Sequence, residues 1–100
     1  MAGTLQQLMS ADPRTVAECL AFARPGDTIL LVDRGVDLLS RWEHASTATL
    51  RSAGLEILAL EADVAAAGLL SLAGRLGMSI LPDAQWVEQV CRSARVLSWK

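Results

Sequence analysis

Two cysteines and one histidine, Cys19, Cys91 and His44, are the residues of this chain that could support nucleophilic chemistry. A cysteine thiolate can attack the terminal sulfur of a persulfide and then yield that sulfur to an acceptor thiol. Such a cysteine must be partly exposed and lie in electropositive surroundings, which lower its pKa. The setting of each thiol therefore indicates whether it is a sulfur carrier or a packing residue.

Cys19 permits two interpretations. It falls in an expected helix on the same face as Val16 and Leu20, an arrangement typical of a buried thiol that only packs. The functional alternative is a persulfide carrier or acceptor. Arg14 would lower the pKa of this thiol and Glu18 would raise it, so the neighbouring charges favour neither interpretation.

The other candidates are expected to be structural. Cys91 shares an apolar helix face with two valines and is expected to pack there. His44 stands in a polar stretch and is expected on the solvated surface. Trp86 is expected in the core, whereas Trp99 suits either the core or a subunit interface.

The sequence contains no familiar nucleotide, metal or hydrolase motif. No Gly-x-Gly-x-x-Gly follows the first expected strand, and no Gly-Lys-Ser/Thr phosphate loop is present. Two distant cysteines are too few for a zinc site or a disulfide scaffold, although one disulfide between them stays open. A single histidine without a nucleophile elbow makes a Ser-His-Asp triad improbable. We therefore expect no cofactor and no metal.

The composition, 52% hydrophobic and 20% charged, is that of one folded domain spanning residues 1–100. The net charge is −2 and no basic stripe is present, which argues against direct binding of nucleic acid. No apolar run reaches the roughly 18 residues of a membrane span, and the first residues do not resemble a secretory signal. We expect a cytoplasmic protein with reduced thiols, whose high apolar content partly serves a subunit interface.

Apolar strands alternate with amphipathic helices along the chain. Asp12 and Pro13 are expected to start the first helix, and Asp83 to cap the last. The expected strands are residues 4–9, 28–33, 55–60, 78–81 and 95–99, and the expected helices lie between them. The expected helix 36–53 has a break near Glu43 and His44, and the expected helix 61–73 has interruptions at Gly68 and Gly74. The acidic pair Glu61 and Asp63 is expected to complement a helix dipole. This order predicts an α/β fold with a doubly wound, mainly parallel five-stranded sheet, helices on both faces and a reversal of strand order near the first strand.

Several segments resemble the DsrH/TusB family in their order and spacing, in a chain of the family's length. They are residues 19–23, 26–32, 35–36 and 59–69, followed by an ending that runs from Trp86 and Val87 to Ser98 and Trp99. DsrH/TusB is the smallest subunit type of the bacterial DsrEFH and TusBCD sulfur-relay complexes. The chain departs from the family pattern at Gln6, Arg34, Ala67 and Pro82.

The resemblance implies a flavodoxin-like (DsrEFH-like) fold and assembly with DsrE/TusD-like and DsrF/TusC-like subunits into a dimer of heterotrimers. TusB-type complexes pass persulfide sulfur toward 2-thiouridine in tRNA, whereas DsrH-type complexes serve cytoplasmic sulfur oxidation. Cys19 resembles the position at which DsrH-type members carry a cysteine, which implies a catalytic Cys19 in a sulfurtransferase component. The principal sulfur-carrying cysteine of these complexes belongs to the DsrE/TusD subunit.

Three functions remain open at this point. The first is a sulfur-relay subunit in which Cys19 exchanges sulfur with a persulfide donor or acceptor protein, more readily than Cys91 does. The second is a non-catalytic structural subunit of the same hetero-oligomer. The third is an unrelated small flavodoxin-like binding module.

Overall fold

The computed structural model describes residues 3–100 and contains a five-stranded β-sheet. Two predictions from the sequence, the single domain over residues 1–100 and the absence of a secretory signal, include residues 1 and 2. These two residues lie outside the described residues. The strands are β1 (Thr4–Leu8), β2 (Thr28–Leu31), β3 (Glu56–Leu60), β4 (Ser79–Leu81) and β5 (Arg95–Trp99). All four strand pairings are parallel, so the expected mainly parallel sheet is parallel throughout.

Six helical segments connect the strands. They are α1 (Pro13–Phe22), the 3-10 helix η1 (Asp33–Arg41), α2 (His44–Ser52), α3 (Glu61–Ala66), α4 (Leu70–Arg75) and α5 (Asp83–Arg92). Within residues 3–100, none of these helices has the length and apolar character needed to cross a bilayer.

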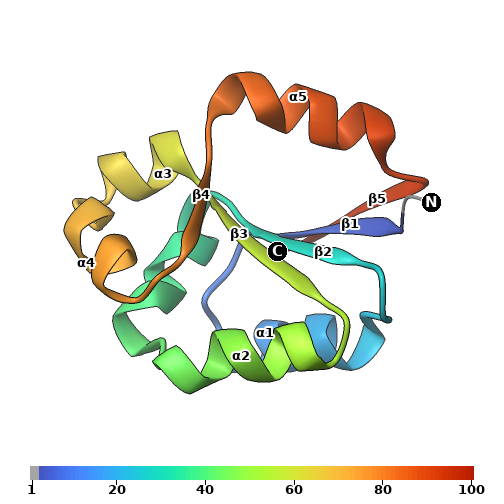
Figure 1. The fold of residues 1–100 in the computed structure, drawn as a ribbon, viewed down its shortest axis with the longest axis horizontal. Coiled ribbons are helices and arrows are strands. Elements are labelled where there is room, and N and C mark those ends of the chain that lie inside the picture. Colours follow the sequence, from blue (N-terminus) through green and yellow to red (C-terminus); the bar gives the residue numbers. More distant parts are fainter. Residues whose placement is uncertain (1–2) are drawn as a thin grey trace.

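The strand order is β4-β3-β2-β1-β5. The chain advances from β1 to β4 in one direction and then returns to place β5 on the far side of β1. Because crossovers between parallel strands are right-handed, the forward connections lie on one face of the sheet and the returning α5 lies on the other. Figure 1 shows α5 on one side of the sheet and α1 and α2 on the opposite side. The predicted doubly wound fold, with its reversal at the first strand, is confirmed.

The hydrophobic core is divided by the sheet into two clusters, because alternate strand residues point to opposite faces. Ile29 and Leu31 point into a larger cluster under the forward helices. Leu30 and Val32 point into a smaller cluster, which also contains Leu5, Leu58, Leu60 and Leu81 and has Trp86 packed against it. The entirely apolar composition of β2 after Thr28 follows from this burial on both sides.

The connection after β2 differs from the expected helix. The break near Glu43 and His44 is confirmed, but the first half is a 3-10 helix that begins at Asp33, so β2 is shorter than expected. Asp33 has a φ of 52° and turns the chain out of the sheet. Its backbone N–H donates to the Asp63 carboxylate, which holds this turn against the start of α3. Glu61 and Asp63 both lie in the first turn of α3, as predicted.

Two expected helix boundaries are wrong. Gly68 does separate α3 from α4, with a φ of 72°, but Gly74 lies inside α4 and does not interrupt it. Asp83 is the first residue of α5 and not its cap, because Pro82 holds the cap position in an extended conformation. The carbonyl of Pro82 accepts the first backbone hydrogen bonds of the helix, from Gln85 and Trp86.

Candidate functional site around Cys19

Helix α1 positions Cys19, and its boundaries follow from short local signals. The Asp12 carboxylate accepts a hydrogen bond of 2.9 Å from the backbone N–H of Arg14, and Pro13 occupies the first turn. At the other end, the N–H of Ala23 donates to the carbonyl of Cys19 at 3.0 Å. The predicted start of this helix at Asp12 and Pro13 is therefore confirmed.

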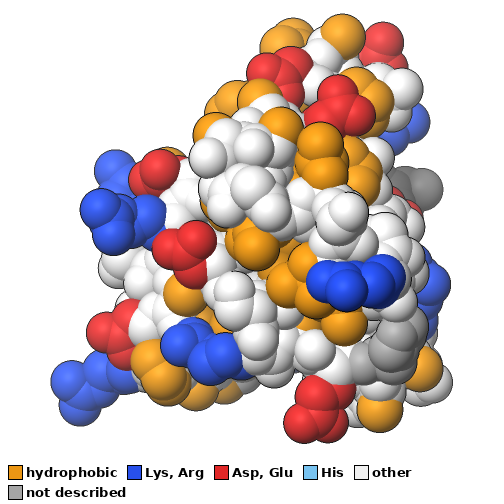
Figure 2. Space-filling view, turned by 90° about the vertical axis from the view of Figure 1, so that its left-hand side faces the viewer, with side chains coloured by type: hydrophobic (Ala, Val, Ile, Leu, Met, Phe, Trp, Pro, Cys, Tyr) orange, Lys and Arg blue, Asp and Glu red, His pale blue; other side chains and the backbone are white. Residues whose placement is uncertain are grey.

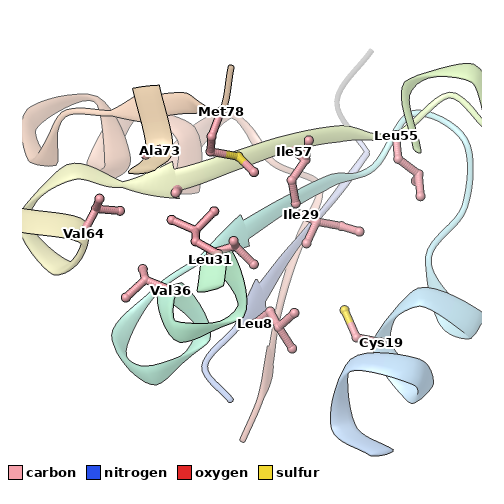
Figure 3. Close-up of a cluster of buried hydrophobic side chains, with 12 residues drawn as sticks. Leu8, Cys19, Ile29, Leu31, Val36, Leu55, Ile57, Val64, Ala73 and Met78 are labelled. Carbon is pink, nitrogen blue, oxygen red and sulfur yellow. The ribbon is translucent and has the colours of Figure 1, made fainter. Parts of the chain in front are cut away.

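The Cys19 side chain is completely buried, with an exposed fraction of 0%. Figure 3 shows its thiol pointing from α1 toward the sheet, where it belongs to the same cluster as Leu8 and Ile29. No other described residue of α1 is buried. Cys19 thus anchors this helix to the sheet, as the packing interpretation of the sequence describes.

Burial also determines the acidity of this thiol. Loss of solvent raises the pKa of Cys19 to about 11. Arg14 and Glu18, the charges that the sequence places near it, are both exposed at the surface. At neutral pH the Cys19 thiol is therefore almost entirely protonated. In this conformation Cys19 is neither accessible nor activated.

A surface hollow of about 430 Å³ lies beside α1, and Cys19 is not among the residues that line it. Leu20 lines this hollow together with Trp42 and Leu50, between α1 and α2. Leu20 is 36% exposed, although it follows directly after the fully buried Cys19. A reagent could reach the thiol only if α1 moved away from the sheet.

Cys91 does not pack as expected. It is exposed on α5, and both cysteines are free thiols, so the disulfide left open by the sequence is absent from the described structure. None of the ten residues of α5 is buried, and only Trp86 and Gln89 are half-buried. The apolar pattern around Cys91 therefore marks an exposed surface and not a core face.

The other aromatic and basic candidates are placed as follows. Trp86 is half-buried against the smaller cluster, which confirms its core role. Trp99 is half-buried against the larger cluster and contacts Phe22 in a tilted arrangement, with ring centroids 5.7 Å apart, a position compatible with both of its proposed roles. His44 begins α2, and its side chain lies outside the described part of the structure.

A buried polar network that begins at the amino ends of β1 and β2 was missed by sequence reasoning. Gln6 is 0% exposed and Asp27 is 7% exposed. The Asp27 carboxylate accepts hydrogen bonds from the backbone N–H groups of Thr4 and Arg24 and from the side-chain amide of Gln6. The carbonyl oxygen of the Gln6 side chain then accepts from the Trp99 indole at 2.8 Å.

This network lowers the pKa of Asp27. Burial by itself raises that pKa, but the hydrogen bonds from Arg24, Thr4 and Gln6 and the nearby Arg95 charge outweigh burial. One signal in the sequence could have revealed the network. Buried tryptophans need acceptors for their N–H groups, and the first strand carries two adjacent glutamines. Indeed Trp86 donates to Gln7, as Trp99 does to Gln6.

Comparison with known families decides what kind of protein this is. A family model described as "DsrH like protein" matches residues 10–96. The chain belongs to the DsrH family. No curated protein sequence matches it significantly. DsrH-family proteins function within multi-subunit sulfur-relay complexes, so this DsrH-family chain is a sulfur-relay subunit. Within residues 3–100, no group of three or more His, Cys, Asp and Glu side chains is placed to hold a metal ion.

Proposed function

We propose that this DsrH-family chain is a non-catalytic structural subunit of a cytoplasmic complex that relays persulfide sulfur. Its partners are a DsrE/TusD-like and a DsrF/TusC-like subunit, and the sulfur-carrying thiol belongs to one of them. The complete burial of Cys19 carries this proposal. Persulfide transfer requires a thiolate that can meet the donor sulfur. A buried thiol with its pKa raised to about 11 offers neither the charge nor the access.

The exposed apolar surface supports a role in assembly. Val87 is 65% exposed and Val90 is 37% exposed on α5. In Figure 2, α5 forms the ridge at the top of the molecule, where hydrophobic atoms lie at the surface beside acidic ones. Apolar side chains surrounded by polar ones are typical of subunit interfaces.

The test is sulfur transfer by the reconstituted complex. Cys19→Ala removes the thiol without placing a polar group in the core. The variant complex is expected to assemble and to transfer sulfur from a persulfidated donor to an acceptor at the wild-type rate. An intact complex that loses transfer because of Cys19→Ala would show that the proposal is wrong.

The second candidate function makes Cys19 a sulfur carrier, and the thin packing of α1 favours it. Since Cys19 is the sole buried residue of that helix, a partner that draws α1 from the sheet would expose the thiol. The Cys19 thiolate would attack the terminal sulfur of the donor persulfide. The donor's sulfur–sulfur bond would break, the donor would leave as a thiolate, and Cys19 would hold the persulfide.

Mass spectrometry separates the two roles. A Cys91→Ser chain has Cys19 as its sole thiol, and a Cys19→Ala chain has only Cys91. Each is incubated in the complex with a persulfidated donor. Gain of one sulfur atom by the Cys91→Ser chain would support the carrier role, whereas no gain would support the structural role. The pathway is assigned in the host: loss of 2-thiouridine on gene deletion indicates tRNA thiolation, and loss of sulfur oxidation indicates the other pathway.

A further inference from the structure

The edge of the sheet at β5 is open. β5 is the last strand in the sheet order and pairs only with β1 among the described strands. The carbonyl of Trp99 accepts a hydrogen bond of 2.8 Å from the N–H of Met9, so the backbone groups of Trp99 face β1. Because these directions alternate along a strand, the N–H and C=O groups of Val96 and Ser98 point outward.

The two edges of the sheet are protected differently. β4, at the opposite edge, has three residues, and short edge strands seldom recruit another strand. β5 has five residues, no proline and an uncharged run of four from Val96 to Trp99. Length and lack of charge make β5 the edge better suited to accept a further strand.

Exposed apolar side chains border this edge on both faces of the sheet. Val96 pairs with Leu5, so it points to the α5 face, and it is 37% exposed. On α5, Gln89 and Arg92 line a hollow with the first residues of β1 and β2. Val87, which is 65% exposed, projects from α5 on the side of the helix opposite Arg92. On the opposite face, Phe22 is 47% exposed and contacts Trp99 with its ring tilted against the indole.

Basic residues outnumber acidic ones beside β5, although α5 carries the exposed Glu88 on its face of the sheet. Arg95 lies on β5, Lys100 follows it, and Arg24 lines the same hollow as Arg95. The Asp27 carboxylate lies in the same hollow and keeps its negative charge, so it partly offsets these two arginines. Glu18 is the single acidic residue of α1. Two copies of this chain joined through β5 would bring like charges together, whereas a strand with carboxylates would complement them.

We propose that β5 receives an edge strand from a partner subunit of the sulfur-relay complex. The incoming strand forms main-chain hydrogen bonds with Val96 and Ser98 and extends the parallel sheet into the partner. It carries carboxylates that face Arg95 and Lys100, and its apolar side chains pack beside Val96 and Phe22. This inference rests on the proposed function, and it identifies where the partner is held.

A matched pair of variants tests the outward backbone groups. Ser98→Pro removes an N–H that faces away from β1, and proline is tolerated at such edge positions because the existing ladder is kept. Ser98→Ala is the control, since both variants lose the hydrogen bond of 3.1 Å from the Gln7 side chain to the Ser98 hydroxyl. Co-purified partner subunits are expected to bind Ser98→Pro about tenfold more weakly, and Ser98→Ala at wild-type strength.

Hydrogen exchange of the wild-type chain gives a second, independent measurement. The amides of Val96 and Ser98 are expected to exchange rapidly in the free chain and slowly in the complex. If exchange of these amides stays rapid in an assembled complex, this inference is wrong but the proposed function stands. Because the wild-type chain is used, this measurement does not depend on whether Ser98→Pro folds. If these amides are protected in a dimer of this chain alone, the strand that pairs with β5 comes from a second copy of the chain, and this inference is wrong. A wild-type chain that binds neither subunit overturns the proposed function and this inference with it.

Discussion

The two thiols of this chain should differ sharply in reactivity, because one is buried and the other exposed. At neutral pH a maleimide reagent is expected to label Cys91 rapidly and Cys19 very slowly. Cys19 labelling should increase as the pH rises toward about 11, the value to which burial raises its pKa. Mass spectrometry of the Cys91→Ser chain measures Cys19 alone. Equal labelling rates for the two thiols in the folded chain would contradict the burial of Cys19.

The carboxylate of Asp27 should make the stability of the fold depend on pH. Its pKa is lowered in the folded state, so its contribution is complete above the unfolded pKa and is lost as the pH falls through the folded pKa. Asp27→Ala is expected to cost roughly 1–3 kcal/mol at neutral pH, because three donors lose their acceptor. The difference from wild type should shrink at about pH 3.

Urea unfolding at the two pH values measures this effect. Asp37→Asn, a change at an exposed carboxylate, is the control and is expected to alter the stability at neutral pH very little. An Asp27→Ala variant with the same penalty under acidic and neutral conditions would mean that the network does not depend on the charge.

At the scale of the elements, Gly35 and Gly74 differ in the space that is free for an added Cβ atom. A Cβ at Gly35 would clash with the backbone carbonyl oxygen of Leu8, only 1.9 Å away, where η1 crosses the end of β1. Gly35→Ala is therefore expected to destabilise the fold by roughly 3 kcal/mol or more. Gly74 lies inside α4, and a Cβ added there would meet nothing within 4 Å, so Gly74→Ala should stabilise by about 0.5–1 kcal/mol.

Thermal unfolding of the two alanine variants gives opposite signs if this geometry is right. A Gly35→Ala chain that melts at the wild-type temperature would show that η1 does not press on β1. A destabilised Gly74→Ala chain would show that α4 is covered at that position.

At the scale of the whole molecule, the exposed apolar surface predicts that the chain does not act as a lone monomer. Val87→Glu and Val90→Glu place charges on α5 without disturbing the core, since both side chains are exposed. Each is expected to weaken binding of the proposed DsrE/TusD-like and DsrF/TusC-like subunits by about tenfold or more, with little change in melting temperature. Leu70→Glu, on the 48% exposed Leu70 of α4, is the matched control and should bind normally.

Light scattering with the partner subunits provides the measurement. A wild-type chain that stays monomeric in the presence of both subunits would refute the assembly role. Loss of binding by Leu70→Glu, with binding retained by Val87→Glu, would move the interface from α5 to α4.

Local signals in the sequence were sufficient for most of the fold. The apolar run from Thr28 predicts a strand buried on both faces, and Asp12 with Pro13 predicts the start of α1. Both are observed because each depends on a few adjacent residues. The alternation of strands and helices, joined to the right-handedness of crossovers, also predicts the parallel sheet and its reversal at β1. The resemblance to DsrH is likewise present in the sequence, and the family match confirms it.

Only the tertiary structure decided which apolar faces are covered. Cys19 and Cys91 occupy similar apolar helix faces in the sequence, yet one is buried and the other is exposed. A helical pattern shows that one side is apolar, but not what lies against it. The forward crossovers place five helical segments on the Cys19 side of the sheet and α5 alone on the other. The contacts of Asp27 with Gln6 and of Gln6 with Trp99 join residues that are far apart in the chain. Only the pairing of β1 with β2 and β5 brings these residues together, so the sequence could not predict the contacts.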